Sequence, residues 1–225
     1  MKRFLLLIRR WLIRLVLAGI VLLLGLTVPL RWIDPPTSAY MLADRVFRNK
    51  PVEFVWVPAV QISPHIKLAV IAAEDQNFPH HRGFDAREIR AAFDAHRQGD
   101  RLRGASTISQ QLARNLYLWS GRHWTRKGLE AVLTVPLEAG LPKARILEIY
   151  LNVVEFDTGV YGVEAGARHY FGKSASDLTR EEAALLAATL PAPKVLNPAS
   201  PNDYLIQRQR WILTQMNNLG PNWAP

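Results

Sequence analysis

The feature that most restricts the fold of this chain is a long apolar segment near its N-terminus. From Trp11 to Leu30 the only charged residue is Arg14. A helix of this length spans about 30 Å, which is the thickness of the hydrocarbon core of a bilayer. We therefore expect residues 1–33 to form a basic tip and one membrane-spanning helix, followed by a separate folded domain.

The charges around this segment predict its orientation. Five basic residues occur up to position 14, and no acidic residue comes before Asp34. Basic flanks stay on the cytoplasmic side, so we expect the N-terminus in the cytoplasm and the rest of the chain across the membrane. The alternative is a cleaved signal peptide, because Thr37-Ser38-Ala39 weakly resembles a cleavage site. Signal peptides have an apolar core of only about 7–15 residues, which favours the anchor.

The composition of the chain excludes several kinds of chemistry. Its 225 residues include no cysteine, so disulfides, thiolate metal sites and thiol nucleophiles are excluded. The formal net charge of +9 could suggest a nucleic-acid partner. Much of the excess, however, flanks the apolar segment, and no nucleic-acid-binding motif is present. We therefore expect no nucleic acid to bind.

A stretch from Ala72 to Asp85, with the sequence AAEDQNFPHHRGFD, contains a candidate catalytic acid. The preceding residues, Pro64 to Ala73, have the pattern of a helix. Ile66, Val70 and Glu74 lie four residues apart and therefore share one helix face. Burial beside an apolar stripe would raise the pKa of the Glu74 carboxyl and make it a proton acceptor near neutral pH. The alternative is a solvated Glu-Asp pair at a helix end.

Five motifs occur in the order typical of one enzyme family. The first has the pattern EDxxFxxHxGxD and begins at Glu74. The others are GASTISQQLARN at 104–115, RKGLE at 126–130, KARILEIYLN at 143–152 and GVYGVEAGARHYFGK at 159–173. The five motifs lie between residues 74 and 173, and the region they characterise covers about residues 60–200. The chain thus resembles the monofunctional peptidoglycan glycosyltransferases of glycosyltransferase family 51, which polymerise glycan strands from lipid II.

The resemblance implies a fold, a reaction and a location. The fold would be all-α, with a lysozyme-like helical domain and a catalytic cleft at 51–225, behind a linker and short helix at 34–50. The reaction would elongate β-1,4 glycan strands from lipid II with inversion and release undecaprenyl diphosphate. The location would be the bacterial inner membrane, with the catalytic domain in the periplasm, near membrane lipid and other cell-wall synthesis proteins.

Two glutamates match the essential acids of this family. Glu74 matches the general base that deprotonates the acceptor sugar. Glu130 matches the second acid, expected to organise the leaving diphosphate through neighbouring cations or through Mg²⁺ or Mn²⁺. Judged from its neighbours alone, Glu130 would form only a weak i,i+4 ion pair with Arg126. We expect both acids on one positively charged cleft, farther apart than in retaining glycosidases.

Further positions match family residues that contact the substrate or its diphosphate. They carry hydroxyl, amide or cationic groups and are Ser106, Thr107, Gln111, Arg114, Arg122, Arg126 and Lys127. Arg114 stands where the family often has Lys, which keeps the charge and adds bidentate geometry. The alternatives are structural: helix capping by Ser106, a buried amide at Gln111 and plain surface charges at the basic positions.

A last group is expected to support the catalytic residues, and it consists of Asp75, Phe78, His81, Glu148 and Asn152.

The remaining sequence has the pattern of helices, with one candidate strand at 52–57. Besides 64–73, helices are expected at 41–47, 85–97, 106–118, 125–139 with a bend at Pro136, from Pro142, after the Thr179–Glu182 capping box, and from Ser200-Pro201 to Gly220.

The helix expected at 85–97 has Ile89, Ala92, Phe93 and His96 on one side, which is largely apolar. Arginines flank that side, at positions 87, 90, 97, 101 and 103. Such a pattern is typical of a solvated amphipathic helix. The alternative is an element that dips into the membrane and contacts acidic head groups.

Two other functions are compatible with parts of the sequence. A single catalytic Glu in a helical lobe would suit a glycan-cleaving lytic transglycosylase or lysozyme, and an anchored protein could also act as a scaffold that only binds glycan. The ordered basic cluster near Glu130 argues against cleavage, because a cleaving enzyme has no diphosphate to hold. No S-x-x-K, S-x-N or K-T-G pattern occurs, so we expect glycan polymerisation without transpeptidation.

Overall fold

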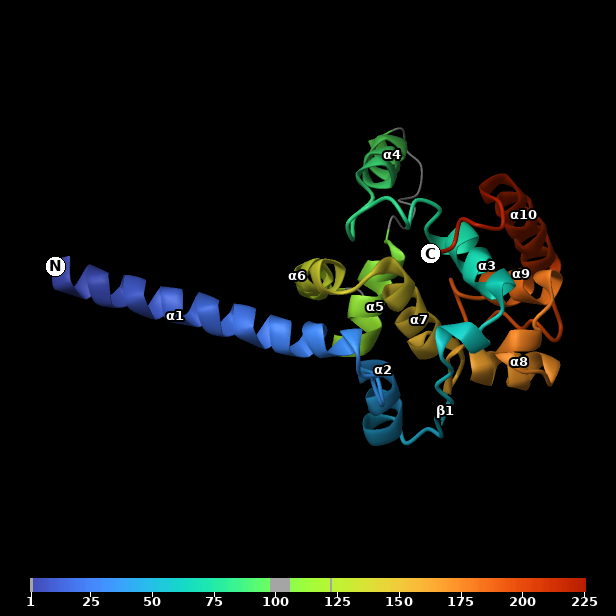
Figure 1. Cartoon of the computed structure of the whole chain (residues 1–225), viewed down its shortest axis with the longest axis horizontal. Coiled ribbons are helices and arrows are strands. Elements are labelled where there is room, and N and C mark those ends of the chain that lie inside the picture. The colour runs from blue at the N-terminus through green and yellow to red at the C-terminus, as the bar shows by residue number, and fades with distance from the viewer. Residues whose placement is uncertain (1, 98–105, 122) are drawn as a thin grey trace.

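The structure is a computed structural model that describes residues 2–97, 106–121 and 123–225. A long N-terminal helix, α1 (Lys2–Thr27), continues into a 3₁₀ turn, η1 (Val28–Arg31), and projects from a helical body (Figure 1). Residues 6–31 are long and apolar enough to cross a membrane, and almost none of that stretch is buried against the protein. The prediction of one apolar N-terminal helix is confirmed.

The body consists mainly of helices, which confirms the predicted all-α class. The longer helices are α3 (Pro64–Glu74), α4 (Ala86–Arg97), α5 (Ile108–Tyr117), α6 (Trp124–Gly140), α7 (Lys143–Val153), α8 (Val163–Phe171), α9 (Arg180–Ala188) and α10 (Asp203–Leu219). Shorter turns are α2 (Ala39–Leu42), a π turn η2 (Ala43–Phe47), and the 3₁₀ turns η3 (Ala59–Gln61) and η4 (Ala175–Asp177).

Local capping residues explain where several of these helices begin. Ser63 caps α3 by accepting from the His65 N–H, as its position before Pro64 predicts. Thr179 forms the predicted capping box of α9 with Glu182. Two helices that were expected to begin at Ser106 and at Ser200-Pro201 begin later. Thr107, not Ser106, caps α5 through a capping box with Gln110, and Asn202, not Ser200, caps α10.

The helices pack as two groups around a shared core. In Figure 1, α3 lies with α9 and α10 on one side of the body, while α5, α6 and α7 form the centre next to the end of α1. Fully buried aromatic side chains fill the interior, among them Phe78, Tyr150, Phe156 and Tyr161. α4 stands apart from both groups at the edge of the body. This arrangement brings the C-terminus of α3 close to the start of α5.

A small three-stranded sheet completes the domain. β3 (Val160–Tyr161) lies in the middle, parallel to β1 (Glu53–Phe54) and antiparallel to β2 (Glu155–Asp157). The expected strand at 52–57 is therefore real but only two residues long. The prediction of a single strand is wrong, because β2 and β3 are too short to show an alternating pattern in the sequence.

Gly162 makes the chain reversal between β3 and α8 possible. Its φ angle is +85°, and a Cβ atom at this position would lie 2.6 Å from the backbone oxygen of Asn152. An L-residue would therefore combine backbone strain with a clash against a fixed carbonyl.

We expect Gly162→Ala to lower the thermal unfolding midpoint of the detergent-solubilised chain by about 4–8 °C, which corresponds to roughly 2 kcal/mol. Gly140→Ala is the matched control, because the nearest atom to its added Cβ, in Val28, is 3.9 Å away. An unchanged midpoint in Gly162→Ala would show that the turn can relax, and would contradict the argument from strain.

Candidate active site

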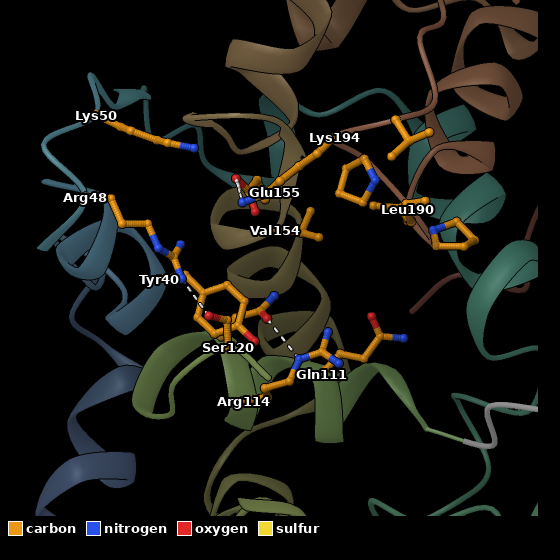
Figure 2. Close-up of a pocket in the computed structure, with 15 residues that line it drawn as sticks. Tyr40, Arg48, Lys50, Gln111, Arg114, Ser120, Val154, Glu155, Leu190 and Lys194 are labelled. Carbon is orange, nitrogen blue, oxygen red and sulfur yellow. Dashed lines mark hydrogen bonds and ion pairs between the residues drawn. The ribbon is translucent and has the colours of Figure 1, made fainter. Parts of the chain in front are cut away.

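Two cavities adjoin the contact between α3 and α5. The larger one, here called the Glu74 cavity, has a volume of about 1,100 Å³ and is lined by Glu74, Asp75, Ser106 and Thr107, together with residues of α4 and α10. The smaller one, the Arg114 cavity, has a volume of about 460 Å³ and is lined by Gln111 and Arg114 of α5 (Figure 2). Because Gln111 and Glu74 are hydrogen-bonded, the two cavities lie next to each other.

Glu74 ends α3, and its side chain is only 14% exposed. Gln111 Nε2 donates to one carboxylate oxygen at 2.8 Å, and Arg208 Nη2 lies 3.8 Å from the other. Burial raises the pKa of the Glu74 carboxyl, while Gln111, Arg208 and Arg114 partly oppose that rise. The predicted burial of Glu74 at the end of an apolar helix is thus present, and the carboxyl has the character of a proton acceptor.

Gln111 is held in one orientation by Tyr150. The Tyr150 hydroxyl donates to Gln111 Oε1 at 3.0 Å, so the amide nitrogen must point toward Glu74. Burial also raises the pKa of Tyr150 well above its ordinary value, which keeps its hydroxyl protonated as a donor. Gln111 is therefore a buried structural amide, as one alternative proposed, and it also contacts Glu74, the candidate base.

The loop after Glu74 is fixed by Asp75 and His81. Asp75 accepts from His81 Nε2 at 2.9 Å and from the backbone N–H of Ile108, at the start of α5, at 2.9 Å. His81 Nδ1 accepts from the Gly83 N–H, which assigns the proton to Nε2. Phe78 is fully buried beside the His81 ring. These contacts tie the first motif to the second and so hold Glu74 in place.

Glu130 lies on α6 and is 1% exposed. Arg126 Nη1 donates to one of its oxygens at 3.0 Å, and Lys127 Nζ contacts the other. Lys127 also donates to Ser106 Oγ at 2.8 Å, and Ser106 lines the Glu74 cavity. The structure therefore connects Glu130 to that cavity through Lys127 and Ser106, while Glu130 itself is not among the lining residues of either cavity.

The surroundings of Glu130 also bear on the suggestion of a divalent ion. Both oxygens of the Glu130 carboxylate already accept hydrogen bonds from cationic groups. These groups compensate the negative charge that would otherwise attract a metal ion. Within residues 2–97, 106–121 and 123–225, no three His, Asp or Glu side chains come together as ion ligands. The donor set therefore does not fit a divalent ion held by the protein, and Arg126 and Lys127 supply positive charge at this point.

The remaining candidate substrate residues differ in their availability. Arg114 lines the cavity named after it and makes one long contact, from Nε to Asn115 Oδ1 at 3.4 Å. The Thr107 hydroxyl donates to the Gly83 carbonyl while capping α5, so it serves the fold. Arg122, together with Arg101 and Arg103, lies outside the described residues.

Glu148 and Asn152 tie α7 to the chain that follows β1. Asn152 accepts from the Val57 N–H and donates to the Val57 carbonyl, both at 2.9 Å. Glu148 accepts from the Ala59 N–H at 2.7 Å. Neither residue lines the Glu74 cavity or the Arg114 cavity, so both supporting candidates act on the fold around α7 and not on Glu74 directly.

Three residues of the C-terminal region line the Glu74 cavity and were missed from the sequence. Arg208 donates to the Ala73 carbonyl at 3.2 Å, and its guanidinium lies 5.6 Å from the ring centroid of Trp211. Trp223 Nε1 donates to the Gln76 carbonyl at 2.8 Å. The spacing of three residues places Arg208 and Trp211 on one face of α10, but nothing in the sequence connects that face to Glu74.

Comparison with known proteins identifies the family. The transglycosylase family model matches residues 42–217. The chain is 51% identical to a biosynthetic peptidoglycan transglycosylase of Shigella boydii serotype 4, with 95% of this chain and 91% of that protein covered. It is 49% identical to one of Shewanella oneidensis, covering 93% and 91%, and 50% identical to one of Pseudomonas fluorescens Pf-5, covering 87% and 83%. The predicted family is therefore confirmed, and the chain belongs to the lysozyme-like transglycosylase family.

Proposed function

We propose that this chain, a glycosyltransferase of peptidoglycan synthesis, elongates glycan strands by joining lipid II units with Glu74 as the general base. The observation that carries the proposal is the environment of Glu74. Its carboxyl is buried, has a raised pKa, is oriented by Gln111 and opens onto the larger cavity. A base of this kind suits the abstraction of a proton from a sugar hydroxyl near neutral pH.

The proposed step is an in-line displacement. Glu74 takes the proton of the acceptor sugar's 4-hydroxyl as that oxygen attacks the anomeric carbon of the donor. The bond between that carbon and the diphosphate oxygen breaks as the new C–O bond forms, which inverts the anomeric configuration. The electron pair leaves with undecaprenyl diphosphate, and no covalent sugar–enzyme intermediate forms.

Cationic residues near α5 and α6 are proposed to stabilise the leaving diphosphate. Lys127 is 40% exposed and lies between Glu130 and the cavity-lining Ser106, so its ammonium can reach a ligand there. Arg114 lies one helical turn beyond Gln111 and offers a guanidinium whose one hydrogen bond to a described residue is the long contact with Asn115. Glu130 would fix the position of Lys127 and Arg126 so that their charges are ready before the substrate arrives.

Glycan cleavage is the competing function. The relatives reported above are named as biosynthetic enzymes, and the cations near Glu130 suit a diphosphate leaving group that a cleaving enzyme lacks. Incubation with purified lipid II and with finished sacculi separates the two. Soluble fragments from sacculi without polymer from lipid II would favour cleavage.

We expect Glu74→Gln to reduce polymerisation of lipid II by about 10²–10⁴-fold, because the amide keeps the shape of the side chain but cannot accept the proton. The measurement is the initial rate of polymer formation from labelled lipid II. Glu181→Gln is the control, since Glu181 is exposed and lines neither cavity. Full activity in Glu74→Gln would contradict the role of base.

A second prediction concerns the pH dependence. The base works in its deprotonated form, so kcat/KM rises with pH through the pKa of Glu74. Arg208 lowers that pKa, and Arg208→Gln should therefore raise it and move the rising limb to higher pH. Arg210→Gln, on the same helix but exposed and outside both cavities, should leave the limb in place. An unshifted limb in Arg208→Gln would indicate that another group controls it.

We propose that the protein is a single-pass protein of the bacterial inner membrane with its N-terminus in the cytoplasm and its catalytic domain in the periplasm. The apolar length of α1 and its basic N-terminal flank support this orientation. Ile89 and Phe93 of α4 are 45% and 59% exposed, which supports a contact of α4 with the bilayer surface.

The absence of cysteine makes this contact measurable. We expect an environment-sensitive dye on Phe93→Cys in proteoliposomes to report an apolar environment, while the same dye on Ser176→Cys, an exposed residue of η4, reports water. Identical aqueous emission from both positions would favour the solvated alternative for α4.

A further inference from the structure

The Arg114 cavity carries more positive charge than the proposed displacement needs. Besides Arg114, its lining includes Arg48, Lys50 and Lys194, against a single acidic residue, Glu155. Its volume of about 460 Å³ is in the range of cavities that bind small ligands. None of the three additional cations belongs to the five motifs, so their convergence on one cavity has no explanation in the proposed chemistry.

The three cations come from two segments far apart in the chain. Arg48 and Lys50 follow the η2 turn, and Lys194 lies in the loop after α9. Figure 2 shows Arg48 and Lys50 on one side of the cavity and Lys194 on the other, with Gln111 and Arg114 along its base. The segment before β1 therefore forms a wall of this cavity.

The cations differ in how far they are already paired. Arg48 donates to Asp44 Oδ1 and to Ser120 Oγ, both at 2.6 Å, so both of its terminal nitrogens are engaged. Lys194 lies 2.9 Å from Glu155 Oε1 and is 40% exposed. The Lys50 backbone N–H donates to the Asp44 carbonyl, but for its ammonium the described residues provide no hydrogen bond or ion pair, and Figure 2 shows that ammonium directed toward Glu155 and Lys194.

The position of the cavity limits what can occupy it. It adjoins the Gln111–Glu74 hydrogen bond, so a substrate that reacts at Glu74 can extend into it. The reacting diphosphate is assigned to Arg114 and Lys127, which leaves Lys50 and Lys194 for a part of the substrate farther from the reaction. In peptidoglycan precursors, the negative charges away from the diphosphate are the carboxylates of the peptide stem.

We propose that Lys50 and Lys194 bind carboxylates of the peptide stem carried by one of the two glycan substrates in the Arg114 cavity. This inference rests on the proposed function. Two ammonium groups on facing walls act as separate point charges, which suits single carboxylates spaced along a peptide. The diphosphate of the other substrate would instead be bound best by a guanidinium with two free terminal nitrogens. Both terminal nitrogens of Arg48 already donate to Asp44 and Ser120.

The experiment compares two substrates and several variants of the full chain in detergent. The substrates are lipid II with an unmodified peptide stem and lipid II whose stem carboxylates are amidated. The variants are K50Q/K194Q, K50Q alone and the control R45Q/R210Q, which also removes two positive charges, at exposed residues that line neither cavity. Initial rates give kcat/KM for each combination, and thermal unfolding confirms that each variant is folded.

We expect the wild type to use the amidated substrate about 5–20-fold less efficiently, as two partly exposed ion pairs are lost. K50Q/K194Q should lose the same factor with unmodified lipid II and nothing further with the amidated form. K50Q alone, which breaks no side-chain hydrogen bond or ion pair among the described residues, should lose about 2–5-fold with unmodified lipid II only. The control should behave as wild type.

Three results would overturn the inference. Retention of the full preference for unmodified stems in K50Q/K194Q would place the carboxylate site elsewhere. An equal loss with both substrates would point to an anion that both share, such as the diphosphate. Wild type that polymerises both substrates equally well would exclude recognition of stem charge, whereas wild type that polymerises neither would overturn the proposed function itself.

Discussion

The site depends on one hydrogen bond, from Gln111 to the buried carboxyl of Glu74. A buried carboxyl without a partner would simply remain protonated and be lost as a base. Gln111 stabilises the charged form without neutralising it, and Arg208 adds a weaker attraction from the far side. The result is a carboxyl whose pKa stays raised by burial, yet whose charged form is supported enough to accept a proton.

This bond requires α3 and α5 to meet at a fixed distance. Asp75 provides that constraint, because its carboxylate joins the loop after α3 to the first N–H of α5 and to His81. The N-terminus of a helix favours a negative charge, so the same contact also stabilises α5. Tyr150 then sets the amide of Gln111 from the side of α7. Three helices thus determine the position of one side chain.

The sequence could predict those parts of the site that depend on neighbours along the chain. The burial of Glu74 follows from the apolar residues four and eight positions before it, and the α9 cap follows from a local pattern. The contributions of Arg208 and Trp223 depend on how the last helix and the C-terminal tail return to α3, and no local pattern records that return. Trp223 also lies outside the range that matches the family model. The two-residue strands were missed for a related reason, since their pairing is set by turns and not by alternation.

The anchor is joined to the catalytic domain by more than a flexible linker. Tyr117 donates to the Leu26 carbonyl at 2.6 Å, and Arg145 donates to the Leu30 carbonyl at 2.8 Å and to Asp34 at 2.7 Å. The first contact satisfies a carbonyl in the last turn of α1 and the second a carbonyl in η1, where the helix end leaves such groups free. Because they come from α5 and α7, which also carry Gln111 and Tyr150, the end of the membrane helix is fixed relative to Glu74. A substrate held in the bilayer by its lipid would therefore meet Glu74 at a defined height, which would remove part of the entropy cost of bringing the two together.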